Sequence, residues 1–182
     1  MGVIGLIFAA VAIYGALMLS GFHKVREGYV GIYKNFGVLQ KSLTEPGIHF
    51  RIPFYQEFIE MNLLIQTDVV TNIPCGTSNG TMVYFNKVEV VNKLRKDMVY
   101  DTVLNYTEDY EKFWITDKLH HEINQFCSKH SLQEIYIDIF DKLDEELIKS
   151  LNKDLAIWAP GIEILSIRVT KPDIPAAIQA NF

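Results

Sequence analysis

The first twenty-two residues contain the feature that most constrains this chain. Residues 2–22, GVIGLIFAAVAIYGALMLSGF, carry no charge and no proline, and Ser20 is their only strongly polar residue. As a helix this run would be about 30 Å long, which matches the hydrocarbon core of a bilayer. A cleaved signal peptide needs a small residue three positions before the cut, whereas a cut after Gly21 places Leu19 there. The run therefore predicts an uncleaved transmembrane anchor over residues 1–23.

The residues alone leave open on which side of the membrane the rest of the chain lies. Lys24 and Arg26 follow the run and favour a cytosolic domain by the positive-inside rule. Two N-x-[ST] triplets, which begin at Asn79 and Asn105, favour a secretory lumen, where such asparagines accept N-linked glycans. Thr107 of the second triplet is followed by acidic residues, which is also typical of the start of a helix.

Composition excludes one class of partner. The formal net charge is -5, so the chain has no basic surplus with which to hold nucleic acid. Cys75 and Cys127 are the two cysteines. They can pair in an oxidising compartment, but the interpretation favoured from the sequence is two small, buried, unpaired side chains.

The first half of the chain is typical of β structure. The pattern predicts a short apolar strand in 26–37 and a strand with alternating apolar residues in 43–54. It predicts one long strand over 58–73, with Ile59, Met61, Leu63 and Ile65 on one face. Pro74 is expected to end the last of these, because proline cannot donate to a strand ladder. The segment 75–80, CGTSNG, predicts a turn, and 82–94 predicts the returning strand of a hairpin.

Beyond Thr107 the apolar period changes from two to 3.6, which predicts helices. The first is expected to bury Tyr110, Phe113, Trp114, Leu119, Ile123 and Phe126. A second starts at Ser131, where Glu134 completes a capping box. Its expected core face is Leu132, Ile135, Ile139, Leu143, Leu147, Leu151 and Leu155. Pro160-Gly161 ends this helix, and 161–172 predicts a further strand. The pattern as a whole predicts an α+β domain.

No local pattern predicts catalysis, a cofactor or a metal. His121-Glu122 begins like a zinc-protease helix, but Gln125 stands where the second histidine is required. His120 and Cys127 are seven residues apart and form one possible ligand pair without an evident third member. The acidic run 138–146 lacks the alternating carboxylates and central glycine of a calcium loop. A solvated helix face explains it better.

Several strings resemble the SPFH superfamily (stomatin, prohibitin, flotillin; band 7) and, within it, the erlins. EPGIHFRIPF resembles the proline-bracketed strand that follows the N-terminal membrane segment of SPFH proteins, and PCGTS, HHEINQFCS and RVTKPDIP resemble erlin sequences. The resemblance covers the anchor and nearly all of the rest. It implies an SPFH domain over residues 24–175, with a mainly antiparallel sheet followed by packed helices. Residues 176–182 would then start a truncated C-terminal helix.

The resemblance also implies a place and a role. Erlins are single-pass membrane proteins of the endoplasmic reticulum (ER) with a cytosolic N-terminus and a luminal domain. Asn105 matches their glycosylation position; Asn79 is carried over less directly, because erlins tend to have glycine there. The implied role is a non-catalytic, oligomeric scaffold in cholesterol-rich domains. It presents inositol trisphosphate receptors to a ubiquitin ligase for ER-associated degradation.

One departure and two alternatives accompany this interpretation. Erlins continue into a coiled coil and an assembly segment, whereas this sequence stops at Phe182, as a fragment or a short isoform would. One alternative is a stomatin-like lipid-organising scaffold on the cytosolic face, which an unmodified Asn105 would favour. The other is a membrane-anchored metal hydrolase, which bound metal at His120 and His121 would favour.

Overall fold

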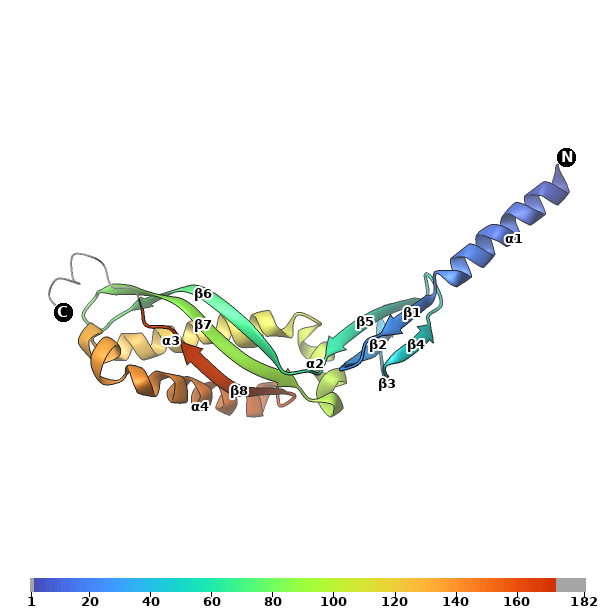
Figure 1. The fold of residues 1–182 in the computed structure, drawn as a ribbon. Helices are drawn as coiled ribbons and strands as arrows, with labels where there is room; N and C mark the ends of the chain where they lie inside the picture. The colour runs from blue at the N-terminus through green and yellow to red at the C-terminus, as the bar shows by residue number, and fades with distance from the viewer. Residues whose placement is uncertain (1, 173–182) are drawn as a thin grey trace. The chain divides into compact units, whose positions relative to one another are not determined.

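The computed structural model describes residues 2–172 and divides the chain into two units, Met1–Leu64 and Ile65–Phe182. The first unit contains two antiparallel sheets, and the second contains one antiparallel sheet together with the packed helices (Figure 1). The α+β class predicted from the sequence is confirmed. The helix start expected at 176–182 lies outside the described residues.

Helix α1 (Val3–Leu19) forms from the apolar N-terminal run. It stops short of the predicted anchor, because Ser20 and Gly21 turn the chain into strand β1, which begins at Phe22. Its 17 residues span about 26 Å at 1.5 Å per residue. Among the residues that the structure describes, no helix is both long and apolar enough to cross a membrane. The structure therefore does not confirm the membrane-spanning helix predicted over residues 1–23.

The first unit contains two small antiparallel sheets. One pairs β1 (Phe22–Val25) with β4 (Gly47–Phe50), and the other has the order β3 (Val38–Thr44), β2 (Tyr29–Asn35), β5 (Gln56–Asn62). Their shared core consists of Val25, Val30, Ile32 and Met61.

An ion pair also holds the first unit together. The Arg26 guanidinium donates to Glu60 Oε2 through Nε at 2.9 Å and Nη2 at 2.7 Å. The Arg26 backbone N–H donates to Glu60 Oε1 at 2.8 Å. These three bonds fasten the segment between β1 and β2 to β5.

The long strand predicted over 58–73 is wrong, because that segment is divided between the two units. Strand β5 ends at Asn62, whose Oδ1 accepts a hydrogen bond from Leu64 N at 2.9 Å and so turns the chain. A new strand, β6 (Gln66–Gly76), then begins. Pro74 does not end it, because β6 is an edge strand, where a missing backbone donor is tolerated.

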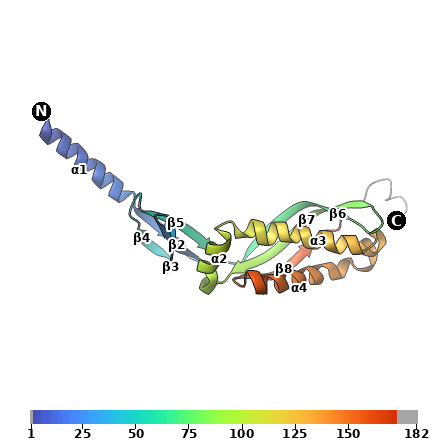
Figure 2. The same ribbon diagram turned by 180° about the vertical axis from the view of Figure 1, so that it is seen from behind.

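The second unit is built on the sheet β6–β7–β8. Strand β7 (Met82–Leu94) lies between β6 and β8 (Ile162–Val169), and both pairings are antiparallel. The β7 bounds confirm the predicted hairpin partner at 82–94, and β8 confirms the strand predicted within 161–172. Helix α3 (Lys118–Lys129) and helix α4 (Phe140–Trp158) lie side by side against the sheet (Figure 2).

The helical region has two features that the apolar period did not predict. A 3₁₀ turn (Lys96–Met98) and helix α2 (Val99–Tyr106) precede the expected helices. A π-helical segment, Lys112–Asp117, leads into α3. Because a π turn holds more residues than an α turn, it shifts the buried face. Ile115 is therefore fully buried, whereas Phe113, predicted to be core, is 57% exposed.

The capping box predicted at Ser131 is confirmed. Ser131 N donates to Glu134 Oε2 at 2.7 Å, and Glu134 N donates to Ser131 Oγ at 3.3 Å. The backbone hydrogen bond from Ser131 lowers the pKa of the Glu134 carboxyl below its ordinary value. The predicted helix is nevertheless two segments, because a π-helical stretch (Glu134–Asp138) and a break at Ile139 precede α4. Six of the seven predicted core residues are buried: Leu132, Ile135, Leu143, Leu147, Leu151 and Leu155.

Candidate modification sites and interaction surfaces

A buried disulfide joins the sheet to the helices in the second unit. Cys75 in β6 and Cys127 in α3 are bonded, with Cα atoms 5.8 Å apart, and neither side chain is exposed. The expectation that both cysteines are buried is correct, and the interpretation of them as unpaired is wrong. A separation of 52 residues carries no local signal of pairing. The bond also excludes the metal-ligand pair His120 and Cys127, because a disulfide-bonded sulfur offers no thiolate to a metal ion.

The two N-x-[ST] asparagines lie on exposed parts of the second unit. Asn105 is in the last turn of α2. Its Nδ2 donates to the Asp101 carbonyl at 2.9 Å. Thr107 Oγ1 accepts a hydrogen bond from Asp109 N at 3.4 Å, which starts the next helix. Asn79 lies in the turn between β6 and β7. Glycosylation at either position stays a prediction.

An apolar hollow lies beside α2. We call it the aromatic hollow and define it by four aromatic residues of unit 2: Tyr106, Phe113, Trp114 and Trp158. Its volume is about 370 Å³, and an ion pair between Lys118 and Asp154 (2.5 Å) borders it. The Tyr106 hydroxyl donates to the Trp158 carbonyl at 2.6 Å and so links α2 to the end of α4. The sequence did not predict this hollow, because its residues come from separate helical segments.

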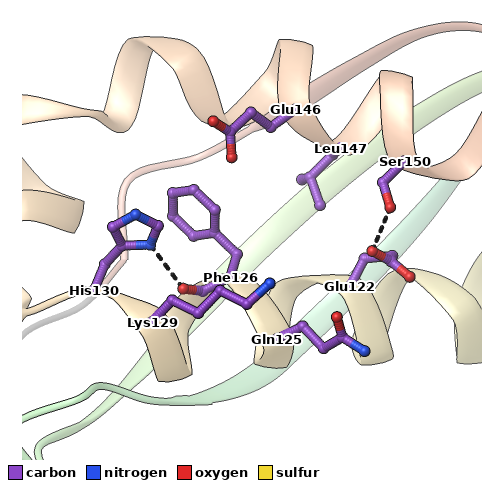
Figure 3. Close-up of a pocket in the computed structure, with 8 residues that line it drawn as sticks. All are labelled: Glu122, Gln125, Phe126, Lys129, His130, Glu146, Leu147 and Ser150. Carbon is purple, nitrogen blue, oxygen red and sulfur yellow. Dashed lines mark hydrogen bonds between the residues drawn. The ribbon is translucent and has the colours of Figure 1, made fainter.

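A smaller, polar pocket lies between α3 and α4. Its volume is about 180 Å³, and Glu122 and Lys129 face it from α3 while Glu146 and Ser150 face it from α4 (Figure 3). Ser150 Oγ donates to Glu122 Oε2 at 2.5 Å, and Lys118 Nζ contacts Glu122 Oε1 at 2.9 Å. Burial alone would raise the pKa of Glu122, but these two partners lower it below its ordinary value. The bond from Ser150 to Glu122 joins α4 to α3, whereas Lys118 and Glu122 both lie on α3.

A polar network lies where the π-helical segment meets the sheet. Asn92 is fully buried, and its Nδ2 donates to Asp68 Oδ2 at 2.6 Å. Gln66 Nε2 donates to Asn92 Oδ1 at 3.4 Å and also to Glu111 Oε1. Burial, and secondarily the Asp68 charge, raise the pKa of Glu111 above its ordinary value of 4.5. Burial and the neighbouring Glu111 also raise the pKa of Tyr110.

This raised pKa predicts a pH effect of the change Glu111→Gln. A carboxyl whose pKa is higher in the folded state stabilises the fold at low pH, and that stabilisation is lost as the pH rises above 4.5 through the folded pKa. Glu111→Gln removes the ionisation and keeps the acceptor for Gln66. We expect the variant to be more stable than the wild type at pH 7 and similar to it at pH 4. Urea unfolding at both pH values measures this, with the exposed Glu108→Gln as control. A variant that is less stable at pH 7 would contradict it.

The histidines considered as metal ligands are not brought together with a third ligand. His121 Nε2 lies 2.7 Å from Gln125 Nε2, on the exposed side of α3. Within residues 2–172, no group of three His, Cys, Asp or Glu side chains is placed to hold a metal ion.

Comparison with known proteins identifies the family. Residues 23–182 match the SPFH domain / Band 7 family, and the chain belongs to that family. It is similar to Erlin of Caenorhabditis elegans, with 50% identity over 171 residues (94% of this chain, 55% of the relative). Erlin-2-A of Xenopus laevis is 50% identical, over 94% of this chain and 51% of the relative. Erlin-1 of Homo sapiens is 48% identical, over 97% of this chain and 51% of the relative.

The comparisons confirm the resemblance to erlins predicted from the sequence. Proteins of this family are non-catalytic, which agrees with the expectation that the chain is not an enzyme. The chain spans about half the length of the curated relatives that it matches.

Proposed function

We propose that the chain is an erlin-type scaffold of the ER membrane, with its second unit in the lumen. Helix α1 is the observation that carries the membrane attachment. Its large apolar side chains are exposed on all sides, and Ile4, Phe8 and Leu19 are each more than 70% exposed. Water is a poor solvent for such a helix, whereas lipid is a good one.

The Cys75–Cys127 bond supports the luminal side. Disulfides form and persist in oxidising compartments such as the ER lumen and are rare in the cytosol. The disulfide and the charges near α1 point to opposite sides, because Lys24 and Arg26 favour a cytosolic domain. The proposal follows the disulfide. Asn105 is exposed and so accessible to an N-linked glycan, which an asparagine in such a triplet receives only on the luminal side.

The finer role follows from the similarity to erlins and is part of the proposal. In this proposed role, the chain assembles with other erlin chains in cholesterol-rich membrane and brings inositol trisphosphate receptors to an ER ubiquitin ligase for degradation. The proposal assigns no reaction to any residue of the chain. Assembly and client capture would use surfaces of the folded units, of which the aromatic hollow is one.

Glycosylation tests the luminal proposal directly. The full chain with a C-terminal tag is expressed in cells and the lysate is treated with endoglycosidase H. We expect the band to shift, with Asn105→Gln abolishing that shift and the matched Asn79→Gln variant retaining it.

Protease treatment of sealed microsomes gives the second readout. A protected tag supports the luminal placement, even where the glycan is absent. A protease-accessible tag on an unglycosylated chain would overturn it and favour a stomatin-like scaffold on the cytosolic face.

A further inference from the structure

A cluster of side-chain oxygens lies where β6 and β7 meet the start of the helical region. Gln66 and Asp68 come from β6, Asn92 from β7, and Tyr110 and Glu111 from the segment that leads into the π-helical turns. Asn92 and Tyr110 are buried, whereas Gln66, Asp68 and Glu111 are only partly covered. Solvent therefore reaches both carboxylates of a cluster that is otherwise enclosed. We call these five residues the oxygen cluster.

Two carboxylates share the oxygen cluster with two amides. Asn92 Nδ2 donates to Asp68 Oδ2 at 2.6 Å, and Gln66 Nε2 donates both to Asn92 Oδ1, at 3.4 Å, and to Glu111 Oε1. One chain of hydrogen bonds thus connects Asp68 to Glu111. Burial raises the pKa of Glu111, and the charges of Asp68 and Asp109 raise it further. Neutral amides donate to the carboxylates but do not cancel their charge, so the cluster stays negative.

The Tyr110 hydroxyl is a second and independent observation. Tyr110 is 2% exposed, and within the described part of the chain its hydroxyl has no hydrogen-bond partner. Burial, and then the charges of Glu111 and Asp68, raise the pKa of this hydroxyl, which therefore lies close to both carboxylates. A buried hydroxyl without a partner is costly, because it has lost its hydrogen bonds to water. Its oxygen is available to a ligand that binds between the carboxylates.

The chemistry of the cluster identifies that ligand as a hard cation. Ca²⁺ takes about six to eight oxygen ligands from carboxylates, amide carbonyls and water, in a flexible geometry. Mg²⁺ demands a near-ideal octahedron at shorter distances, which a mixed set of side chains on three segments suits less well. Zinc and copper favour nitrogen and sulfur ligands, whereas all five side chains present oxygen.

We propose that the oxygen cluster is a calcium site, with ligands from Gln66, Asp68, Asn92, Tyr110 and Glu111. Each amide can turn its oxygen toward the ion in place of its nitrogen, because the two ends of a carboxamide have nearly the same shape. With only two carboxylates, we expect weak binding, with a Kd of about 10⁻⁴–10⁻³ M. The ion would join the β6–β7 hairpin to the start of the helical region. This site goes beyond the scaffold role proposed above and does not depend on it.

Terbium luminescence on the full, oxidised chain in nonionic detergent tests the site at pH 7. Tb³⁺ occupies calcium sites and luminesces when a nearby Tyr or Trp side chain is excited. We expect a saturable signal that CaCl₂ displaces, with MgCl₂ displacing it much less at equal concentration. A signal that CaCl₂ up to about 10 mM, above the expected Kd, does not displace would overturn the proposal.

Asp68→Asn tests the ligand assignment. The change removes one charge and keeps both the size of the side chain and an acceptor for Asn92. We expect calcium to bind about tenfold more weakly, since ligand charge sets the affinity of such sites. Glu108→Gln is the matched control, because Glu108 is exposed and its change alters the net charge equally. Equal affinity in the wild type and Asp68→Asn would overturn the proposal.

Tyr110→Phe separates a ligand from a purely structural side chain. Because the hydroxyl has no partner, its removal should not destabilise the chain in a calcium chelator, yet it should weaken calcium binding severalfold. This variant decides the question if Asp68→Asn fails to fold by circular dichroism. Unchanged calcium affinity in Tyr110→Phe would remove Tyr110 from the site.

Calcium should also stabilise the fold through this site. We expect CaCl₂ at about 10 mM to raise the midpoint of thermal unfolding of the wild type by about 3–6 °C. In Asp68→Asn and Glu111→Gln the rise should be less than about 1 °C. The same rise in all three proteins would place the stabilising ion elsewhere and overturn the proposal.

Discussion

Replacing Cys75 and Cys127 together by alanine is expected to lower the free energy of unfolding of the second unit by about 4 kcal/mol, given the 52-residue separation of the two cysteines. The bond limits the freedom of the unfolded chain, and that limit grows with the size of the closed loop. Urea unfolding of the oxidised wild type and of the double variant, followed by circular dichroism, measures the difference.

Reduction supplies the control for this prediction. A reductant present throughout unfolding should destabilise the wild type by a similar amount and leave the double variant unchanged. Removal of a native disulfide usually lowers the free energy of unfolding by about 2–5 kcal/mol. A difference of less than about 1 kcal/mol between the double variant and the oxidised wild type would contradict the prediction. The result also bears on compartment, because a fold that depends on this bond requires an oxidising environment.

Leu151→Ala is expected to cost about 3 kcal/mol. Leu151 is fully buried on the face of α4 that packs against β8, so its removal leaves a cavity between helix and sheet. The loss combines the transfer free energy of the deleted atoms with the cost of that cavity.

Ile157→Ala is the matched control on the same helix. Ile157 is 65% exposed, and its truncation should change the free energy of unfolding by less than about 0.5 kcal/mol. Equal losses for the two variants would show that α4 does not pack on the sheet through Leu151. The measurement is again urea unfolding, at a fixed pH and temperature.

Much of the second unit could be predicted from local patterns. The period of two over 82–94 predicted β7, and the spacing of Ser131 and Glu134 predicted a capping box that the hydrogen bonds confirm. The period of 3.6 predicted most of the buried face of α4. These features depend on neighbours within a few residues, so the local sequence contains the information that they need.

Other predictions were wrong where the outcome depended on sheet order, on a change of helical phase or on where a helix ends. Pro74 stays within β6 because that strand is at an edge of its sheet, and sheet order is a long-range property. Phe113 is exposed because a π turn changes the helical phase. The apolar N-terminal run is present as a helix, but Ser20 and β1 set where that helix ends.

Local sequence patterns were sufficient to predict the α+β class, the family resemblance, the main hairpin, the helix cap and the two candidate glycosylation positions. The folded structure was needed to show that Cys75 bonds Cys127 and that separate helical segments line the aromatic hollow. These features depend on contacts between residues far apart along the chain. Residues tens of positions apart meet only when the whole unit closes, and no local period or propensity encodes which of them will do so.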